Sequence, residues 1–169
     1  MTKRIRRFLG NFQPTSITLI PDILSKIEVE ATRQRYEAKW RTNLGIILQR
    51  QRRFDEAIQV FQRQVEISQT LDDQRELAIG LNCLGGVFQQ LGRLDEAIEA
   101  FQRRIEISQA IDDQHSLAIG FNCLGGVFQQ QGQLDEAIQV FQRQVEISQT
   151  LNEQHSLTIG FNCLGGVFQ

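Results

Sequence analysis

The feature that most constrains this chain is an internal repeat with a fixed period of 40 residues. Residues 81–120 and 121–160 align without a gap and are identical at 28 of 40 positions. Residues 41–80 fit the same frame, and residues 161–169 begin a further copy. A fixed period of this kind predicts a stacked array, in which each unit buries its apolar face against its neighbours.

Within each unit the apolar residues recur with the period of an α-helix. In the second copy the first stripe is Leu77, Leu81, Leu84, Phe88 and Leu91. After Gly92 interrupts the pattern, the second stripe is Ala97, Phe101, Ile105 and Ser108. No segment alternates with the period of two that a strand requires. Each unit is therefore predicted to be an antiparallel helix pair.

Polar residues at the ends of these stripes predict where the helices begin. Asp95 and Glu96 fall in a first turn, where the helix dipole favours negative charge. Asp112 and Asp113 suit the turn and the N-cap before the following helix. Because such acids recur in every copy, we interpret them as structural residues.

The helix pair resembles the tetratricopeptide repeat, whose pattern is W-x2-L-G-x2-Y…A-x3-F…P. The matching pairs here are Leu84-Gly85, Leu124-Gly125, Ala97-x3-Phe101 and Ala137-x3-Phe141. The closing Pro is absent and the unit exceeds the usual length of about 34 residues, as in the long-helix variety of kinesin light chains and bacterial signalling scaffolds. The resemblance covers residues 41–169 and implies an all-α fold, a right-handed superhelix of antiparallel helix pairs.

The frame also predicts how the chain is divided. The expected parts are a basic segment (1–20), a degenerate capping helix with the start of the array (21–40), three repeats (41–80, 81–120 and 121–160) and a partial repeat (161–169). We expect residues 21–32, which Pro21 can open, to cover the apolar end of the stack. At the other end, an apolar set begins a helix without its partner: Phe161, Leu164, Val167 and Phe168. Two interpretations stay open: a fragment of a longer array, or an open edge through which the chain self-associates.

Charge is distributed unevenly along the chain. Residues 1–53 hold 12 Lys and Arg against 4 Asp and Glu, whereas residues 54–169 hold 6 against 16, so the two parts carry +8 and −10. The basic part either complements the acidic part or attaches the chain to nucleic acid or an anionic membrane surface. Residues 3–7 carry four of these cations, and Ile5, Phe8, Leu9 and Phe12 share one helical face. We favour the first interpretation.

Nothing in the sequence predicts a catalytic, metal or cofactor site. His115 and His155 occupy matching loop positions where the first copy has Arg75, which indicates solvated surface. Cys83, Cys123 and Cys163 recur every 40 residues. Equivalent atoms on stacked units lie roughly 8–10 Å apart, too far for a disulfide. Zinc needs about four convergent ligands, and no His or second Cys falls near each cysteine. Free thiols suit a reducing compartment, so a cytoplasmic location is expected.

By the geometry of the resembled family, one face of the first helix lines a concave groove. The candidate peptide-binding residues on that face are Ile79, Asn82, Gln89, Ile119, Asn122, Gln129 and Asn162, accompanied by Gly86, Gly126, Ile159 and Gly166. An Asn amide offers a donor and an acceptor to a peptide backbone, and Gly lets that backbone come close. The alternative is that the Asn side chains only satisfy neighbouring groups. The groove residues include no Lys or Arg, so the carboxylate clamp of chaperone-binding relatives is not reproduced.

The sequence therefore predicts a non-enzymatic scaffold that binds a peptide or partner protein in the concave groove. Two alternatives remain. One is attachment through the basic N-terminal segment; the other is a regulatory fragment of a larger multi-domain signalling protein whose catalytic part lies elsewhere.

Overall fold

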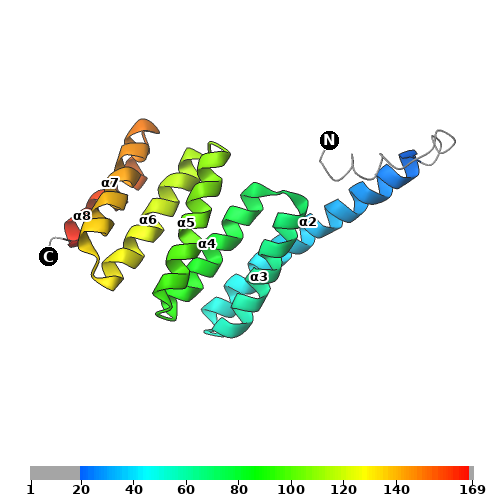
Figure 1. The fold of residues 1–169 in the computed structure, drawn as a ribbon, viewed down its shortest axis with the longest axis horizontal. Helices are drawn as coiled ribbons and strands as arrows, with labels where there is room; N and C mark the ends of the chain where they lie inside the picture. Colours follow the sequence, from blue (N-terminus) through cyan, green and yellow to red (C-terminus); the bar gives the residue numbers. More distant parts are fainter. Residues whose placement is uncertain (1–19, 168–169) are drawn as a thin grey trace.

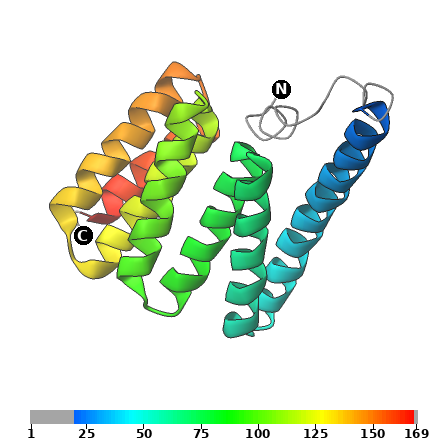
Figure 2. The same ribbon diagram turned by 45° about the vertical axis from the view of Figure 1, so that its right-hand side comes forward.

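The computed structural model describes residues 20–167, which form seven helices and no strand (Figure 1). The helices are α2 (Ile20–Arg50), α3 (Phe54–Leu71), α4 (Gln74–Gln90), α5 (Leu94–Ala110), α6 (Gln114–Gln131), α7 (Leu134–Thr150) and α8 (Gln154–Val167). Each packs against the next, and the antiparallel pairs succeed one another along a single curved stack (Figures 1 and 2). The predicted all-α superhelix is confirmed.

The helices fall into an inner and an outer set. The first helices of successive repeats, α2, α4, α6 and α8, also pack on one another, whereas no comparable packing links α3, α5 and α7. An array whose first helices approach one another more closely than its second helices must curve toward the first. The inner, concave face is therefore lined by the first helices, as the sequence predicted.

The turns within and between repeats use left-handed backbone conformations. Within a repeat the turn residue is Gly92 (φ 73°) or Gly132 (φ 77°), and in the first copy it is Arg52 (φ 61°). Between repeats the turn residues are Asp72 (φ 56°), Asp112 (φ 53°) and Asn152 (φ 56°). Glycine adopts this region without strain, and Asp and Asn tolerate it better than other side chains do. The period of 40 is thus fixed by turn residues that recur in register.

Aspartates after these turns cap the next helix. The side chain of Asp73 accepts a hydrogen bond from the Glu76 amide at 3.2 Å, and that of Asp113 accepts one from the Ser116 amide at 3.0 Å. Each cap satisfies one of the otherwise unpaired amides of a first turn. The predicted capping role of Asp113 is confirmed.

The core of each repeat depends on a glycine of the first helix that faces a phenylalanine of the second. A Cβ atom on Gly85 would lie 2.6 Å from the Phe101 ring. The matching distances are 2.4 Å for Gly45 and Phe61 and 2.5 Å for Gly125 and Phe141. The three rings are at most 1% exposed. The predicted stripes are buried, except for Leu91, which caps the end of α4 and is 38% exposed.

The predicted capping helix over residues 21–32 was wrong. Residues 20–50 form one uninterrupted helix, because neither Gly nor Pro falls between Pro21 and Gly45. Ile27 and Val29 are 39% and 69% exposed, so this part of α2 does not cover the end of the stack.

At the other end of the array, α8 has no second helix among the described residues, and Phe161 is 55% exposed. The basic residues 3–7 and Phe168 lie outside the described residues.

Gly85→Ala and Gly86→Ala are expected to shift stability in opposite directions. An added methyl at Gly85 meets the rigid Phe101 ring, so overpacking should lower the free energy of unfolding by about 1–3 kcal/mol. At Gly86 the nearest atom lies 3.9 Å away, so Ala should raise stability by up to about 1 kcal/mol through helix propensity. Urea denaturation of the two variants measures both effects. A loss of stability of equal size in both would contradict the packing described here.

Candidate functional site

The predicted binding residues lie on the inner face of α4, α6 and α8. Ile79 and Ile119 are 44% and 39% exposed, although isoleucine is normally buried. Asn82, Asn122, Gln89 and Gln129 are half-buried, and Asn162 is exposed. The seven residues thus combine accessible apolar side chains with a row of amides on one surface.

Each inner-face asparagine of α4 and α6 is held by the cysteine of the next repeat. The Cys123 thiol donates to Oδ1 of Asn82 with a sulfur–oxygen distance of 3.6 Å, and the Cys163 thiol donates to Oδ1 of Asn122 at 3.5 Å. The amide nitrogens of both asparagines form no hydrogen bond with other described residues. In both asparagines the oxygen thus accepts one weak hydrogen bond within the array, and the N–H donors are left available.

The inner-face glutamines lie over the glycines of the next repeat. Nε2 of Gln89 is 3.7 Å from the place of a Cβ atom on Gly126, and Nε2 of Gln129 is 3.6 Å from that on Gly166. Gln129 also donates to the Gly166 carbonyl at 3.2 Å. A Cβ atom at either glycine would make ordinary van der Waals contact with the glutamine, so this packing does not require glycine. The sequence did not predict the contact.

Buried polar residues at the junctions between repeats were missed at the sequence level. Gln64 on α3 and Gln144 on α7 are 0% and 2% exposed. Nε2 of Gln64 donates to the Glu76 carbonyl at 2.7 Å, and Nε2 of Gln144 donates to the Ser156 carbonyl at 2.9 Å. Each amide also donates to a serine on its own helix, at 3.2 and 2.9 Å. These glutamines bind each second helix to the first helix of the next repeat.

The glycines opposite these glutamines provide a sequence signal from which the buried glutamines could have been predicted. A Cβ atom on Gly80 would lie 1.7 Å from Oε1 of Gln64, and one on Gly160 would lie 2.1 Å from Oε1 of Gln144. A polar residue on the buried stripe, paired with a glycine 16 positions later in each copy, is visible in the repeat alignment. This pairing indicates that a large side chain of one helix packs directly against the backbone of the next helix at its glycine.

At the middle junction the same position holds Arg104, which is 4% exposed. Its guanidinium makes one hydrogen bond, from Nη2 to the Ser116 hydroxyl at 3.3 Å. Nε and Nη1 have no partner, and neither does the Ser108 hydroxyl, although its counterparts accept from Gln64 and Gln144. Burial lowers the pKa of Arg104, while the Cys123, Asp113 and Cys83 groups act in the opposite direction.

The three cysteines are free, half-buried thiols. Burial raises the pKa of Cys83 to about 11, against a smaller opposing effect of Arg104, and burial also raises the pKa of Cys123 and of Cys163. Within residues 20–167, no group of three His, Cys, Asp or Glu side chains is placed to hold a metal ion.

The histidines lie on the surface, as predicted. Nδ1 of His115 is 2.9 Å from Oε1 of Glu153, which joins the start of α6 to the residue before α8. The hydrogen bond from His115 is the largest cause of a lowered pKa at Glu153, followed by that from Ser156. His155 is exposed and forms no such pair among the described residues. The His115–Glu153 pair links two successive repeats.

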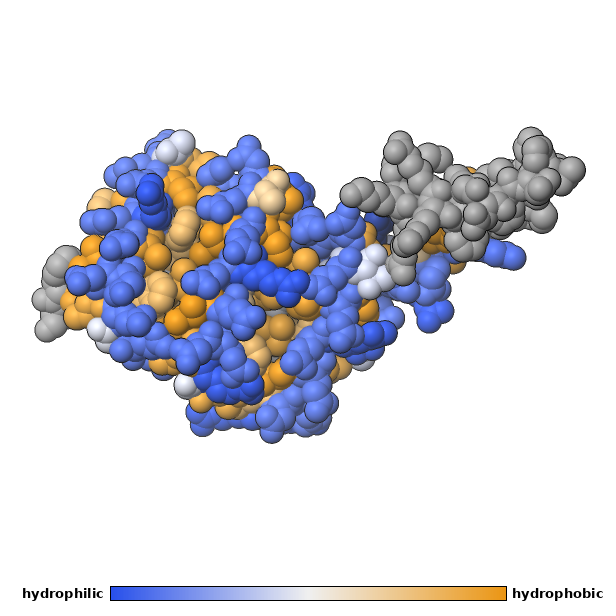
Figure 3. Space-filling view, viewed as in Figure 1, coloured by the Kyte–Doolittle hydropathy of each residue, from blue (hydrophilic) through white to orange (hydrophobic). Residues whose placement is uncertain are grey.

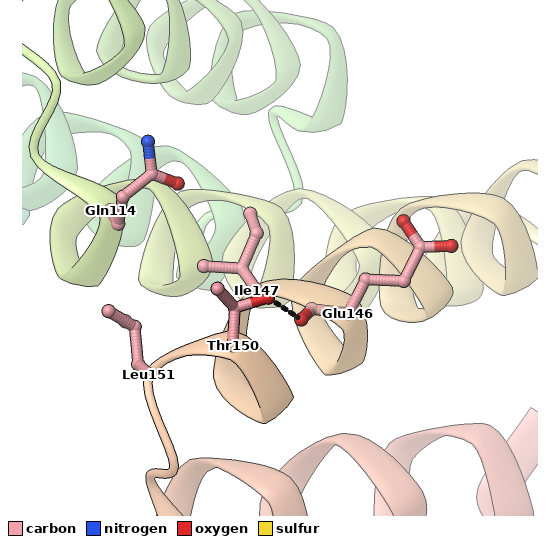
Figure 4. A pocket seen from close by; sticks show the side chains of 5 residues that line it. All are labelled: Gln114, Glu146, Ile147, Thr150 and Leu151. Carbon is pink, nitrogen blue, oxygen red and sulfur yellow. Dashed lines mark hydrogen bonds between the residues drawn. The ribbon is translucent and has the colours of Figure 1, made fainter.

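A small open depression of about 170 Å³ lies outside this inner face (Figure 4). It is lined by Gln114, Glu146, Ile147, Thr150 and Leu151. The Thr150 hydroxyl donates to the Glu146 carbonyl at 3.0 Å, and the Glu146 carboxylate pairs with Arg143 at 3.2 Å. These groups satisfy one another and offer no convergent chemistry. On the face shown in Figure 3, apolar residues are likewise interrupted by polar ones over the array.

Family models of the tetratricopeptide repeat match residues 36–111 and 124–154. The chain belongs to the tetratricopeptide repeat family. The resemblance drawn from its residues is confirmed. Comparison with curated proteins gives no match. None of the described helices of this tetratricopeptide repeat chain is both long and apolar enough to span a membrane.

Solved structures share the fold. BtubC (BKLC) from P. vanneervenii superposes with a TM-score of 0.72 at 24% identity, over 78% of this chain and 55% of that one. The TPR domain of Arabidopsis FLU gives 0.65 at 20% identity, over 69% and 98%. A putative kinesin light chain with TPR-like repeats from Podosopora anserina gives 0.67 at 20% identity, over 77% and 64%. This chain thus spans 55% of the length of the BtubC structure, and the likeness is one of fold.

The Cys83 thiol is expected to react slowly with iodoacetamide. Its pKa of about 11 leaves roughly 200-fold less thiolate at pH 8 than an ordinary cysteine has. Its alkylation rate should keep rising with pH up to about 11. The folded pKa is the higher one, so the stability contributed by the neutral thiol is present below about pH 8.5 and is lost as the pH rises toward 11. Mass spectrometry of timed alkylation, with a cysteine peptide as reference, measures the alkylation rate of Cys83 as a function of pH. A plateau near pH 8.5 would contradict it.

Proposed function

We propose that this chain is a non-catalytic scaffold that binds an extended segment of a partner protein along its inner face. Tetratricopeptide repeats are generally protein-interaction modules. The observation that carries the proposal is the pair of available amide donors on Asn82 and Asn122, each held by a thiol of the following repeat. Because donors on a folded surface that meet no protein acceptor can serve a ligand, these amides suit peptide carbonyl groups.

The spacing of the repeats supports an extended ligand. Successive first helices are roughly 10 Å apart, which equals about three residues of extended chain. A peptide lying across the array would therefore present a carbonyl group to an asparagine about every third residue. The exposed side chains of Ile79 and Ile119 would add apolar contact between these hydrogen bonds.

The amides are also oriented before binding. Each asparagine loses little further rotamer freedom when a peptide arrives, because its oxygen is already hydrogen-bonded within the array. Ordering side chains costs about 0.5–1.5 kcal/mol each at an interface. A preformed row of donors reduces this cost, so a peptide can gain useful affinity from few contacts.

The triple variant Asn82→Ala/Asn122→Ala/Asn162→Ala is expected to lose partners that wild type captures from a native lysate. It removes the proposed donors from all three first helices, and the loss should exceed tenfold, since each hydrogen bond contributes about 0.5–1.5 kcal/mol. The matched control is Gln59→Ala/Glu99→Ala/Gln139→Ala, which removes exposed polar side chains at the same spacing from the outer helices.

Circular dichroism should show both triple variants to be as helical as wild type, and quantitative mass spectrometry compares what each retains. Equal capture by wild type and the asparagine variant would refute binding through the inner face. If only the outer-face control lost captured partners, the binding surface would lie on α3, α5 and α7 instead.

A further inference from the structure

Four large apolar side chains on α2 are more than half exposed. Val29, Tyr36, Trp40 and Ile47 are 69%, 72%, 58% and 52% exposed, and the sequence contains no other tyrosine or tryptophan. With 3.6 residues per turn, the four fall within an arc of roughly 40° and span roughly 27 Å of the helix. α2 is the outermost helix at its end of the stack (Figure 2), and these four residues, the α2 stripe, face away from the array. Exposed aromatic residues of this kind are typical of protein interfaces.

The α2 stripe occupies the surface on which a preceding repeat would pack, but its residues exclude such a repeat. In the repeat frame Trp40 and Ile47 are equivalent to Gly80 and Val87 of α4. In α4 both positions are buried, and a Cβ atom on Gly80 would lie 1.7 Å from Oε1 of Gln64 on the preceding α3. An indole at this position fills the space that the glutamine needs. Any partner of the stripe must therefore pack on it in another way.

The spacing of the stripe is symmetric. Its residues are separated by seven, four and seven positions, so the pattern reads the same in both chain directions about Ala38. When two α2 helices are placed antiparallel about this point, Val29 lies opposite Ile47 and Tyr36 lies opposite Trp40, and each pair occurs twice. Two-fold pairing of one surface with itself is the commonest form of soluble oligomer. Paired aromatic rings stabilise such a contact beyond the area that they bury.

The charged residues beside the stripe fit the same pairing. Near its centre, Lys39 and Glu37 each have an ion-pair partner in their own chain, at 4.0 and 2.8 Å. Near its ends, Glu28 and Arg50 are exposed and form no ion pair within the described part of the chain. In the antiparallel arrangement, Glu28 of one helix and Arg50 of the other lie on the same flank, about 3 Å apart along the axis. Two reciprocal ion pairs result, whereas a parallel pair would set each charge beside its own copy.

We propose that the chain forms a two-fold homodimer in which the α2 stripes of two copies pack antiparallel, with Trp40 of one copy against Tyr36 of the other. A second copy is the occupant that this surface fits, because it supplies an apolar residue opposite every residue of the stripe and an opposite charge beside both Glu28 and Arg50. The interface uses none of the candidate peptide-binding residues. The dimer therefore presents two inner faces, and its existence is independent of the proposed function.

Sedimentation equilibrium of the full chain over a range of concentrations tests the dimer. Wild type should approach twice the mass of one chain as the concentration rises, and the emission of Trp40 should move to shorter wavelengths along the same curve. Tyr36→Ser and Trp40→Ser should each raise the dissociation constant at least about tenfold, as residues at the centre of an interface do. The matched controls Ile79→Ser and Leu134→Ser replace apolar side chains that are each 44% exposed on other helices, and they should leave the constant unchanged.

Charge reversal tests the antiparallel direction. Glu28→Arg and Arg50→Glu should each weaken the dimer by about fivefold or more, because each turns two attractions into repulsions. Glu28→Arg/Arg50→Glu should return the dissociation constant to that of wild type, and a double variant as weak as the single ones would overturn the antiparallel pairing. Circular dichroism should show every variant to be as helical as wild type, since each replaced side chain is exposed.

A wild-type chain that stays monomeric at every concentration would overturn the proposal. If Trp40 then already emitted as a buried indole, residues 1–19 of the same chain would be the segment that covers the stripe. A dimer that dissociates in Ile79→Ser or Leu134→Ser, but not in Tyr36→Ser, would place the interface on another surface and would overturn the proposal as well.

Discussion

The whole array depends on one kind of contact, in which a large side chain of one helix packs against a glycine of the neighbouring helix. Within a repeat, Gly85 receives the ring of Phe101; between repeats, Gly80 receives the amide of Gln64. A methyl group at either glycine would overlap the opposing side chain, at 2.6 Å from the Phe101 ring and 1.7 Å from Oε1 of Gln64. Because the contact within a repeat recurs in all three complete repeats, and the contact between repeats at all three junctions, they fix the distance between helices and hence the curvature of the stack.

Glycine inside a helix is unfavourable by about 0.8–1 kcal/mol relative to alanine, and burial of the opposing side chains offsets this. Because the interface between helices is close-packed, the helix spacing that it sets also sets the spacing of residues on the inner face. It places Asn82 and Asn122 at a constant interval on the inner face and brings each within reach of the next cysteine. Binding capacity is thus a consequence of packing: the same register that buries the core also aligns the row of amide donors.

Much of this follows from the sequence, because periodicity reports which side chains are buried. The helix pairs and the Asp113 cap could both be predicted from one copy compared with another. The continuity of α2 could not, since weak similarity to a repeat suggested a boundary where the backbone has no breaking residue. The roles of Gln64 and Arg104 were also missed, because a polar residue on an apolar stripe reads as exposed until its partner glycine is known. The cysteine–asparagine bonds join residues 41 positions apart, and only the three-dimensional stacking shows them.

The central claim is that the inner amides, rather than the outer face, meet the ligand. The most direct measurement is side-chain amide NMR of the full chain with the tightest-bound member of a random peptide library. The account predicts that the NH2 resonances of Asn82 and Asn122 shift and exchange more slowly with solvent, while those of Gln59 and Gln139 on the outer helices stay unchanged. Shifts confined to the outer glutamines, with the two asparagine resonances unmoved at saturation, would contradict it.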